Sequence, residues 1–408
     1  MNKQKLQKFA ELTVKVGVNI KEGQLLVINS PVECREFTRL LVEEAYKAKA
    51  KDVIVRWSDD LVNKLYYENV SEEVLTDVPN YVIEQYKYIV SENGALISIA
   101  APTPGLLKDI DPKRLNMSQR AVSDKIAFFR KYTMSNEGQW CVVSYPTQAW
   151  AEKVFPNTEN AVDKLMDAIL EASRVSEEND PVLEWKKHMD ILAKHNKMLN
   201  EYNFKNLHFK NSLGTDLVVE LVEGHIWGGG GEVAQNGVFF APNIPTEETF
   251  TMPHKFGVNG KVVATKPLNY QGKLIEDFYL EFKDGKVVNF DAKKEKDALK
   301  SLIEFDEGSC RLGEVALISH DSPISKMNIL FYNTLFDENA SCHLALGNAY
   351  TMNIKDGHNL SEEELVKKGY NKSHTHVDFM FGSRDMEVYG TTHDEKLVKV
   401  FSNGNFVF

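Results

Sequence analysis

The chain has 408 residues, of which 43% are apolar and 26% charged. This composition excludes a mainly disordered chain and favours two domains of about 100–200 residues each. No apolar run approaches the roughly 18 residues of a membrane-spanning helix, and the N-terminus shows no signal-peptide pattern. The net charge of −11 makes nucleic acid and anionic membranes poor candidates as partners. Four widely spaced cysteines (Cys34, Cys141, Cys310 and Cys342) form no CxxC pair, which indicates a reduced, cytoplasmic protein.

The N-terminal part alternates strands and helices. We expect a helix at Glu33–Ala50 and strands at Gln24–Asn29, Asp52–Trp57, Ala95–Ala100 and Trp140–Ser144. Strands separated by long crossovers predict an α/β domain with a parallel sheet covered by helices on both faces.

A helical stretch from Asn157 to Asn203 is interrupted at Glu178-Asn179-Asp180-Pro181, which reads as a break and a helix start. We therefore predict a domain boundary there. The first domain would span residues 1–179 and the second residues 180–408.

The second domain is rich in strand signals. We expect a helix at Lys293–Phe305 and strands at Leu217–Val222, Gly260–Thr265, Phe278–Phe282 and Lys286–Phe290. Asn259-Gly260, Asp284-Gly285 and Asn403-Gly404 are typical hairpin turns. These features predict an α+β domain with mainly antiparallel strands.

Catalytic chemistry is expected in the second domain, because all eleven histidines lie at position 188 or later. His374, His376 and Asp378 alternate along one segment. On a strand they would share a face, where they could bind a metal or orient one another. The alternative is a solvated polar strand face.

Two further segments offer carboxylates. On a strand, only one member of the Glu247-Glu248 pair would face a site, and a capping or solvated turn is the alternative. Glu314 opens the apolar run Gly313–Ile318. A buried, unpaired carboxylate costs several kcal/mol, so Glu314 needs a metal, a base or an exposed strand end.

The densest polar cluster spans Phe336–His343 and contains Glu338. A thiol protease built on Cys342-His343 is disfavoured, because neighbours in sequence rarely present both side chains to one substrate atom. The same objection applies to His320-Asp321-Ser322 as a triad. Gly228–Gly231 lack the sequence context of a phosphate-binding loop and indicate a flexible loop. Carboxylates and imidazoles gathered in one domain favour two divalent ions.

Four blocks in order resemble the thermophilic aminopeptidase family of metallopeptidases, which includes aminopeptidase T, aminopeptidase S and PepS. These blocks are Asn243–Thr251, Gly313–Leu317, Asn333–Gly347 and His376–Met380. The resemblance runs nearly the whole length and implies a two-domain cytoplasmic homodimer. It implies Glu248, Glu314, Glu338, His343, His376 and Asp378 as metal ligands and Tyr350 as the active-site tyrosine. Polar Thr249, where family members often carry an apolar residue, is a mild departure expected to face away from the metals.

The resemblance implies a metallo-aminopeptidase that acts on short peptides with a free N-terminus. The ions would be zinc or cobalt, with manganese or magnesium as alternatives. Glu314 would serve as the bridging or basic carboxylate and Tyr350 as the oxyanion donor. Two alternatives stay open, namely a metal-dependent amidase on non-peptide substrates and a non-catalytic ligand-binding protein of the same fold.

Overall fold

The computed structural model describes residues 2–408 and divides into two compact units. The first unit comprises Met1–His188 with Gly231–Pro245, and the second comprises Met189–Gly230 with Thr246–Phe408. Helix α10 (Pro181–Tyr202) runs through the division between them. The division at 179/180 inferred from the sequence stays a prediction.

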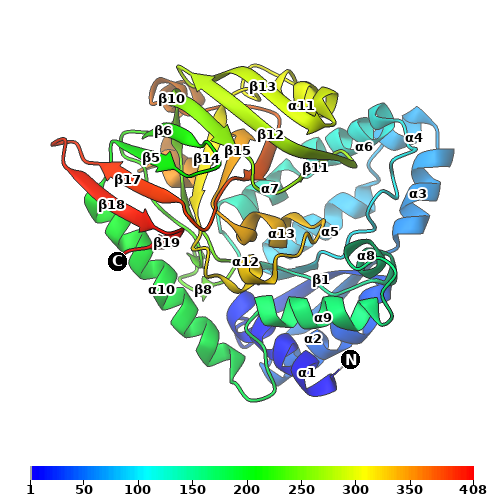
Figure 1. The fold of residues 1–408 in the computed structure, drawn as a ribbon. Coiled ribbons are helices and arrows are strands. Elements are labelled where there is room, and N and C mark those ends of the chain that lie inside the picture. The colour runs from blue at the N-terminus through cyan, green and yellow to red at the C-terminus, as the bar shows by residue number, and fades with distance from the viewer. Residues whose placement is uncertain (1) are drawn as a thin grey trace. The chain divides into compact units, whose positions relative to one another are not determined.

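The first unit is built on a parallel sheet of order β2-β1-β3-β4, and Figure 1 shows the helices around it. Its strands are β1 (Leu25–Pro31), β2 (Asp52–Ser58), β3 (Ala95–Ile99) and β4 (Trp140–Val143), with the short pair β7 (Glu232–Val233) and β8 (Phe239–Phe240). Its helices are α1 (Lys3–Leu12), α2 (Arg35–Lys47), α3 (Asp60–Asn69), α4 (Glu72–Thr76), α5 (Asn80–Ser91), α6 (Pro112–Lys125), α7 (Ala127–Met134), α8 (Gln148–Val154) and α9 (Ala161–Ala172), with short turns η1 (Thr13–Gly17) and η2 (Val32–Cys34). The predicted α/β architecture is confirmed.

The apolar runs in the sequence explain this sheet. Leu25, Leu26, Val27 and Ile28 of β1 are all at most 1% exposed, as expected for a strand buried on both faces of a parallel sheet. Helix α1 starts where the Asn2 side chain accepts hydrogen bonds from the backbone of Gln4 and Lys5, which satisfies two otherwise unpaired donors of its first turn.

The second unit is dominated by antiparallel strands, which confirms the predicted α+β class. A large sheet has the order β11-β12-β10-β6-β5-β17-β18-β19, with β13 paired to β12. Its strands are β5 (Asn206–Lys210), β6 (Asp216–Leu221), β10 (Pro253–Val263), β11 (Leu268–Tyr270), β12 (Lys273–Lys283), β13 (Lys286–Lys294), β17 (Glu387–Thr391), β18 (Leu397–Ser402) and β19 (Asn405–Phe406). A four-stranded sheet of order β16-β15-β14-β9 lies in the same unit and comprises β9 (Thr249–Thr251), β14 (Leu312–Leu317), β15 (His343–Gly347) and β16 (His376–Met380).

Short helices connect these strands. They are α11 (Lys296–Ile303), α12 (Pro323–Met327), α13 (Thr334–Asp337), α14 (Glu362–Lys367), η3 (Glu338–Ala340), η4 (Thr351–Asn353) and η5 (Gly357–Asn359). Apolar side chains from both sheets, including Phe278, Leu344 and Phe379, share one core. That shared core gives the four-stranded sheet a rigid base.

Two of the three expected hairpin turns occur. Asp284-Gly285 joins β12 to β13 and Asn403-Gly404 joins β18 to β19, each with positive φ at both residues. The prediction of a turn at Asn259-Gly260 is wrong, because both residues lie inside β10 opposite β6. Gly260 has φ +117, and a Cβ there would lie 2.2 Å from the carbonyl oxygen of Asp216. The glycine is needed for close approach of two strands, not for a hairpin.

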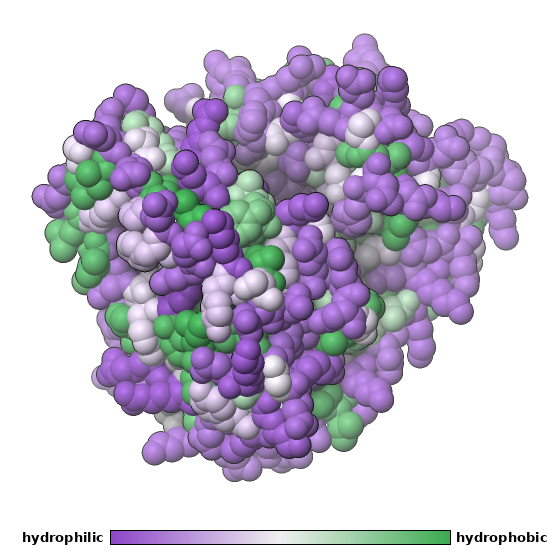
Figure 2. All heavy atoms as spheres, turned by 180° about the vertical axis from the view of Figure 1, so that it is seen from behind, coloured by the Kyte–Doolittle hydropathy of each residue, from purple (hydrophilic) through white to green (hydrophobic). Residues whose placement is uncertain are grey.

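Hydrophilic side chains cover most of the face drawn in Figure 2, with hydrophobic ones in scattered groups. Within residues 2–408, no helix has both the length and the apolar character needed to cross a membrane. All four cysteines are free and buried.

Candidate metal centre

The register of the four-stranded sheet brings the polar side chains named in the sequence to one face. His343 lies opposite Ala316, Asp378 opposite Ala345, and His376 opposite Gly347. Side chains two residues apart on a strand share a face. Glu314, His343, His376 and Asp378 therefore point the same way, although they come from three strands.

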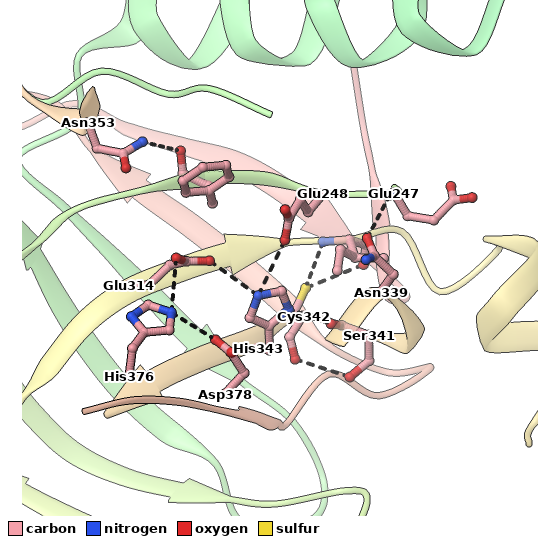
Figure 3. A network of polar contacts seen from close by, with 12 residues as sticks. Glu247, Glu248, Glu314, Asn339, Ser341, Cys342, His343, Asn353, His376 and Asp378 are labelled. Carbon is pink, nitrogen blue, oxygen red and sulfur yellow. Dashed lines mark hydrogen bonds and ion pairs between the residues drawn. The ribbon is translucent and has the colours of Figure 1, made fainter. Parts of the chain in front are cut away.

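These side chains form a continuous polar network (Figure 3). His343 Nε2 lies 3.3 Å from Glu314 Oε1 and 3.5 Å from Glu248 Oε2. His376 Nε2 lies 3.6 Å from Glu314 Oε2 and 3.4 Å from Asp378 Oδ1. Glu314 thus lies between the two imidazoles. It is 5% exposed, so the alternative of an exposed strand end does not hold.

Glu248, not Glu247, joins this cluster. One ligand atom each from Glu248, Glu314 and His343 lies within 4.8 Å of the others. The Glu247 side chain points away from the cluster (Figure 3), and its backbone N–H donates to Asn339 Oδ1 at 2.7 Å. Because the pair lies in the segment just before β9, strand alternation alone could not choose between them.

The glycine run helps to place Glu248. Gly228 pairs with Phe250 of β9 through two backbone hydrogen bonds of 3.0 and 2.9 Å. Gly229 has φ +123, and a Cβ there would lie 2.4 Å from the Glu248 carbonyl oxygen. These two glycines pack against the site segment instead of forming the expected flexible loop.

Thr249 follows Glu248 and is fully buried. Its hydroxyl donates a hydrogen bond to the side-chain oxygen of Asn196 on α10. The polar residue at this position therefore has a partly buried hydrogen-bond partner within the second unit.

Glu338 begins η3, immediately before β15. Burial, together with the charges of Glu248 and Asp378, raises its pKa well above the usual value. Asp337 has a different role, since its carboxylate accepts backbone hydrogen bonds from Phe331 at 2.7 Å and Asn333 at 3.0 Å. Asp337 and Glu338, although adjacent in sequence, therefore have different contacts.

Tyr350 lies beside the cluster. Its ring centroid is 4.8 Å from that of His376. Burial and the nearby charge of Glu314 raise the pKa of Tyr350, so its hydroxyl stays protonated and can donate a hydrogen bond.

His374 does not share the face of His376, which corrects the expected three-residue alternation. Strand β16 begins at His376, and His374 is exposed. The His374 backbone N–H donates to Asp306 Oδ2 at 2.7 Å, and the Ser373 hydroxyl lies 2.8 Å from Asp306 Oδ1. These bonds hold residues 373–374 in a loop.

The two nucleophile motifs that were disfavoured have structural roles. The Cys342 thiol donates to the Ile318 carbonyl, and burial raises its pKa to about 12, so the reactive thiolate is absent near neutral pH. The Ser322 hydroxyl accepts a hydrogen bond from the Ser325 backbone at the start of α12.

The pKa values of the clustered side chains indicate whether the site favours a positive charge. Burial lowers the pKa of His343, but the hydrogen bond to Glu314 and the charge of Asp378 outweigh it and raise that pKa to about 10. Burial likewise lowers the pKa of His376, but Asp378 raises it to about 9. The pKa of Glu248 rises to about 7, mainly through burial.

Without a metal, protons on the two imidazoles would supply the positive charge that the carboxylates need. Asp378 Oδ1 is buried and forms no hydrogen bond of good geometry. Carboxylate oxygens and imidazole nitrogens are ligands for divalent ions, and a bound ion displaces such protons. The donor set therefore fits a metal.

A buried sheet face that carries both carboxylates and imidazoles defines a candidate metal-dependent enzyme. Known proteins agree with this class. The chain matches the thermophilic metalloprotease family M29 over residues 2–406.

Curated relatives cover almost the whole chain. It is 46% identical to aminopeptidase 2 of Geobacillus stearothermophilus, covering 99% of this chain and 98% of that protein. It is 47% identical to aminopeptidase AmpS of Bacillus subtilis, covering 99% of each. The solved structure of wild-type AmpT from Thermus thermophilus superposes with a TM-score of 0.92 at 36% identity, covering 100% of both chains.

The chain belongs to the thermophilic metalloprotease family M29 and is a metallo-aminopeptidase. This confirms the resemblance inferred from the four sequence blocks. The predicted fold class is confirmed as well, since the AmpT structure has the same architecture.

Proposed function

We propose that this protein releases N-terminal amino acids from short peptides by metal-assisted hydrolysis with two divalent ions. The observation that carries the proposal is the buried convergence of Glu248, Glu314 and His343, whose ligand atoms lie within 4.8 Å of one another. The ligands would be Glu248, Glu314, Glu338, His343, His376 and Asp378. Bound divalent ions supply an activated water and polarise a carbonyl.

Zinc or cobalt is the proposed ion, and manganese or magnesium is the alternative. Imidazole nitrogens favour the borderline ions, whereas carboxylates alone would favour magnesium or manganese. The presence of His343 and His376 beside the carboxylates supports the first choice.

Glu314 is the proposed general base. Its two oxygens face different imidazoles, at 3.3 Å from His343 and 3.6 Å from His376, so it lies at the middle of the ligand set. We infer that Glu314 accepts a proton from the attacking water and delivers it to the leaving amine.

Tyr350 is the proposed oxyanion donor. Its raised pKa keeps the hydroxyl protonated, and its ring packs beside His376. A hydroxyl held in place before the reaction can stabilise negative charge that develops on the substrate oxygen only in the transition state.

Recognition of a free α-amine would make the enzyme an exopeptidase. The carboxylates around the site attract a cationic or metal-coordinating end group. Acetylation would convert that amine into a planar amide, which donates electrons poorly and adds bulk.

The test compares an aminoacyl p-nitroanilide with its N-acetyl form. Rapid cleavage of the free form alone would support an aminopeptidase. Equal rates on both would contradict the proposal and indicate a general amidase. Failure of the purified protein to bind any divalent metal would instead indicate a non-catalytic ligand-binding protein.

A cytoplasmic homodimer is also proposed. The family resemblance supports the dimer, and four buried free thiols support a reducing compartment. Sedimentation analysis would contradict the dimer if the protein behaved as a monomer at micromolar concentration.

A further inference from the structure

Asn348 holds both the His376 ring and the chain just before it. Its backbone N–H donates to the Thr375 carbonyl at 2.7 Å, and its carbonyl accepts a hydrogen bond from His376 Nδ1 at 2.7 Å. Its side-chain oxygen Oδ1 accepts a hydrogen bond from the Ser373 backbone at 3.3 Å. One residue thereby contacts the His376 ring and residues 373 and 375 of the segment that leads to it.

The bond from the ring selects the tautomer of His376. A carbonyl oxygen can only accept a hydrogen bond, so Nδ1 must carry a proton. In the neutral imidazole, Nε2 is then the bare nitrogen. Nε2 is also the atom that faces Glu314 at 3.6 Å and Asp378 at 3.4 Å.

Asn348 is itself held from two directions. The Tyr370 hydroxyl donates to Asn348 Oδ1 at 3.0 Å, and Asn348 Nδ2 donates to the Ala349 carbonyl at 2.8 Å. Tyr370 is 8% exposed, so little water is available to replace its hydrogen bond. The side-chain amide of Asn348 is therefore restrained in one orientation.

Two glycines make room for this arrangement. A Cβ at Gly313 would lie 2.3 Å from the Asn348 carbonyl oxygen, and a Cβ at Gly347 would lie 2.1 Å from the Thr375 carbonyl oxygen. Gly313 directly precedes Glu314. The close approach that brings the Asn348 carbonyl to His376 is thus built into the strand that carries Glu314.

We propose that Asn348 is a positioning residue: its side chain, restrained by the Tyr370 hydroxyl, holds its backbone carbonyl where that carbonyl fixes the tautomer and ring orientation of His376 for metal binding. This inference rests on the proposed function, because it takes His376 as a ligand. Hydrogen bonds that orient a ligating imidazole raise metal affinity, and their loss typically costs about 10–100-fold.

The experiment titrates metal-free protein with cobalt and records both the affinity and the visible absorption of the bound ion. Asn348→Ala keeps the carbonyl that binds His376 Nδ1 but loses the side-chain hydrogen bonds that hold it in place. It should bind cobalt about 10-fold more weakly, with a changed absorption spectrum. Tyr370→Phe removes only the hydroxyl and should weaken cobalt binding by about threefold to tenfold.

Tyr132→Phe is the matched control. The buried Tyr132 hydroxyl donates to the Gly94 carbonyl at 3.0 Å in the first unit, so this variant also loses one buried tyrosine hydrogen bond. It should lower the melting temperature and leave cobalt affinity and spectrum unchanged.

Wild-type cobalt affinity and spectrum in both Asn348→Ala and Tyr370→Phe would overturn the positioning role. If Asn348→Ala does not fold, Tyr370→Phe decides alone. His376→Ala tests the assignment of His376 as a metal ligand independently of the role of Asn348. If His376→Ala also binds cobalt as wild type does, the ligand assignment itself is wrong. If only His376→Ala loses affinity, the ligand assignment stands and the role of Asn348 fails.

Discussion

The two four-stranded sheets both bury most of their central strands but use that burial differently. In the first unit, residues 25–28 of β1 are all apolar and at most 1% exposed. In the second unit, every residue of β14 is buried, but one of them is Glu314. The neighbouring strand β15 likewise begins with His343, which is 1% exposed.

Burial of an ionised side chain costs several kcal/mol unless a partner compensates it. The parallel sheet avoids this cost, whereas the antiparallel sheet gathers carboxylates and imidazoles around one point. A structure that needed stability alone would gain from apolar residues there. The difference indicates that the polar face of the second sheet is retained for binding and chemistry.

Removal of metal should give the largest difference in behaviour between the two sheets. A chelator should abolish peptidase activity, and re-addition of zinc, cobalt or manganese should restore it. Metal bound only to the folded state should stabilise it by about 2.7 kcal/mol at one hundred times Kd. Hydrogen exchange should therefore become faster in β14, β15 and β16 after chelation and stay unchanged in β1 and β3. Uniform protection in both sheets would contradict the difference between them.

Glu314→Gln removes the charge at the centre of the site and keeps the shape of the side chain. We expect kcat to fall by about 10⁴-fold, because the amide cannot accept the proton of the attacking water. The metal-free variant should fold but be less stable than wild type, because the lost charge is the partner of two buried imidazoles. Thermal unfolding and steady-state kinetics check both parts. Retention of most of the wild-type kcat would remove Glu314 from the role of base.

Tyr350→Phe should lower kcat by about 10²–10³-fold, the cost of losing one oxyanion donor. KM should change little, because the hydroxyl is proposed to contact charge that exists only in the transition state. A raised KM with unchanged kcat would assign Tyr350 to substrate positioning. The Phe250 ring, 6.2 Å from that of Tyr350, keeps the aromatic packing in the variant.

Much of the fold followed from apolar runs and turn residues. The strands of the first unit and the hairpins at Asp284-Gly285 and Asn403-Gly404 have local causes, namely side-chain burial and residues that tolerate positive φ. Asn259-Gly260 has the same local chemistry. Its φ of +117 at Gly260 instead serves the approach of the β6 backbone, a tertiary cause that local sequence does not carry.

The candidate site shows the same limit. Alternation along β16 pointed to His376 and Asp378, but the strand starts too late to include His374, because Asp306 holds that loop from 68 residues away. Asn348 was missed entirely. Its contact with the His376 ring is made by its backbone carbonyl, and residue type gives no signal for the partner of a carbonyl.

A partly buried carboxylate outside the site, Glu232, provides the smallest test of this comparison. Partial burial raises the pKa of Glu232 in the first unit to about 7, and burial likewise raises the pKa of Glu248 in the second unit to about 7. Glu248 has an imidazole partner, His343, at 3.5 Å. The polar contact of Glu232 is the neutral Asn136 amide at 3.3 Å. The two carboxylates therefore have similarly raised pKa values, but Glu248 has a partner that can carry positive charge, whereas Glu232 has a neutral neighbour.

Glu232→Gln should raise the melting temperature by an amount that grows with pH. The folded pKa lies above the usual 4.5, so between these two values the folded chain binds more protons than the unfolded chain, and wild-type stability falls as pH rises. The variant loses this dependence. Its advantage should increase from about pH 5 to about pH 7 and then level off, by a few degrees at most. Calorimetry of both proteins across this range is the measurement, with exposed Glu159→Gln as the matched control that should show no such trend. Peptidase activity should stay at the wild-type level throughout, because Glu232 lies outside the proposed ligand set. A melting-temperature difference that does not change with pH would mean that ionisation of Glu232 costs the folded state little. The lack of a cationic partner would then not distinguish Glu232 from Glu248.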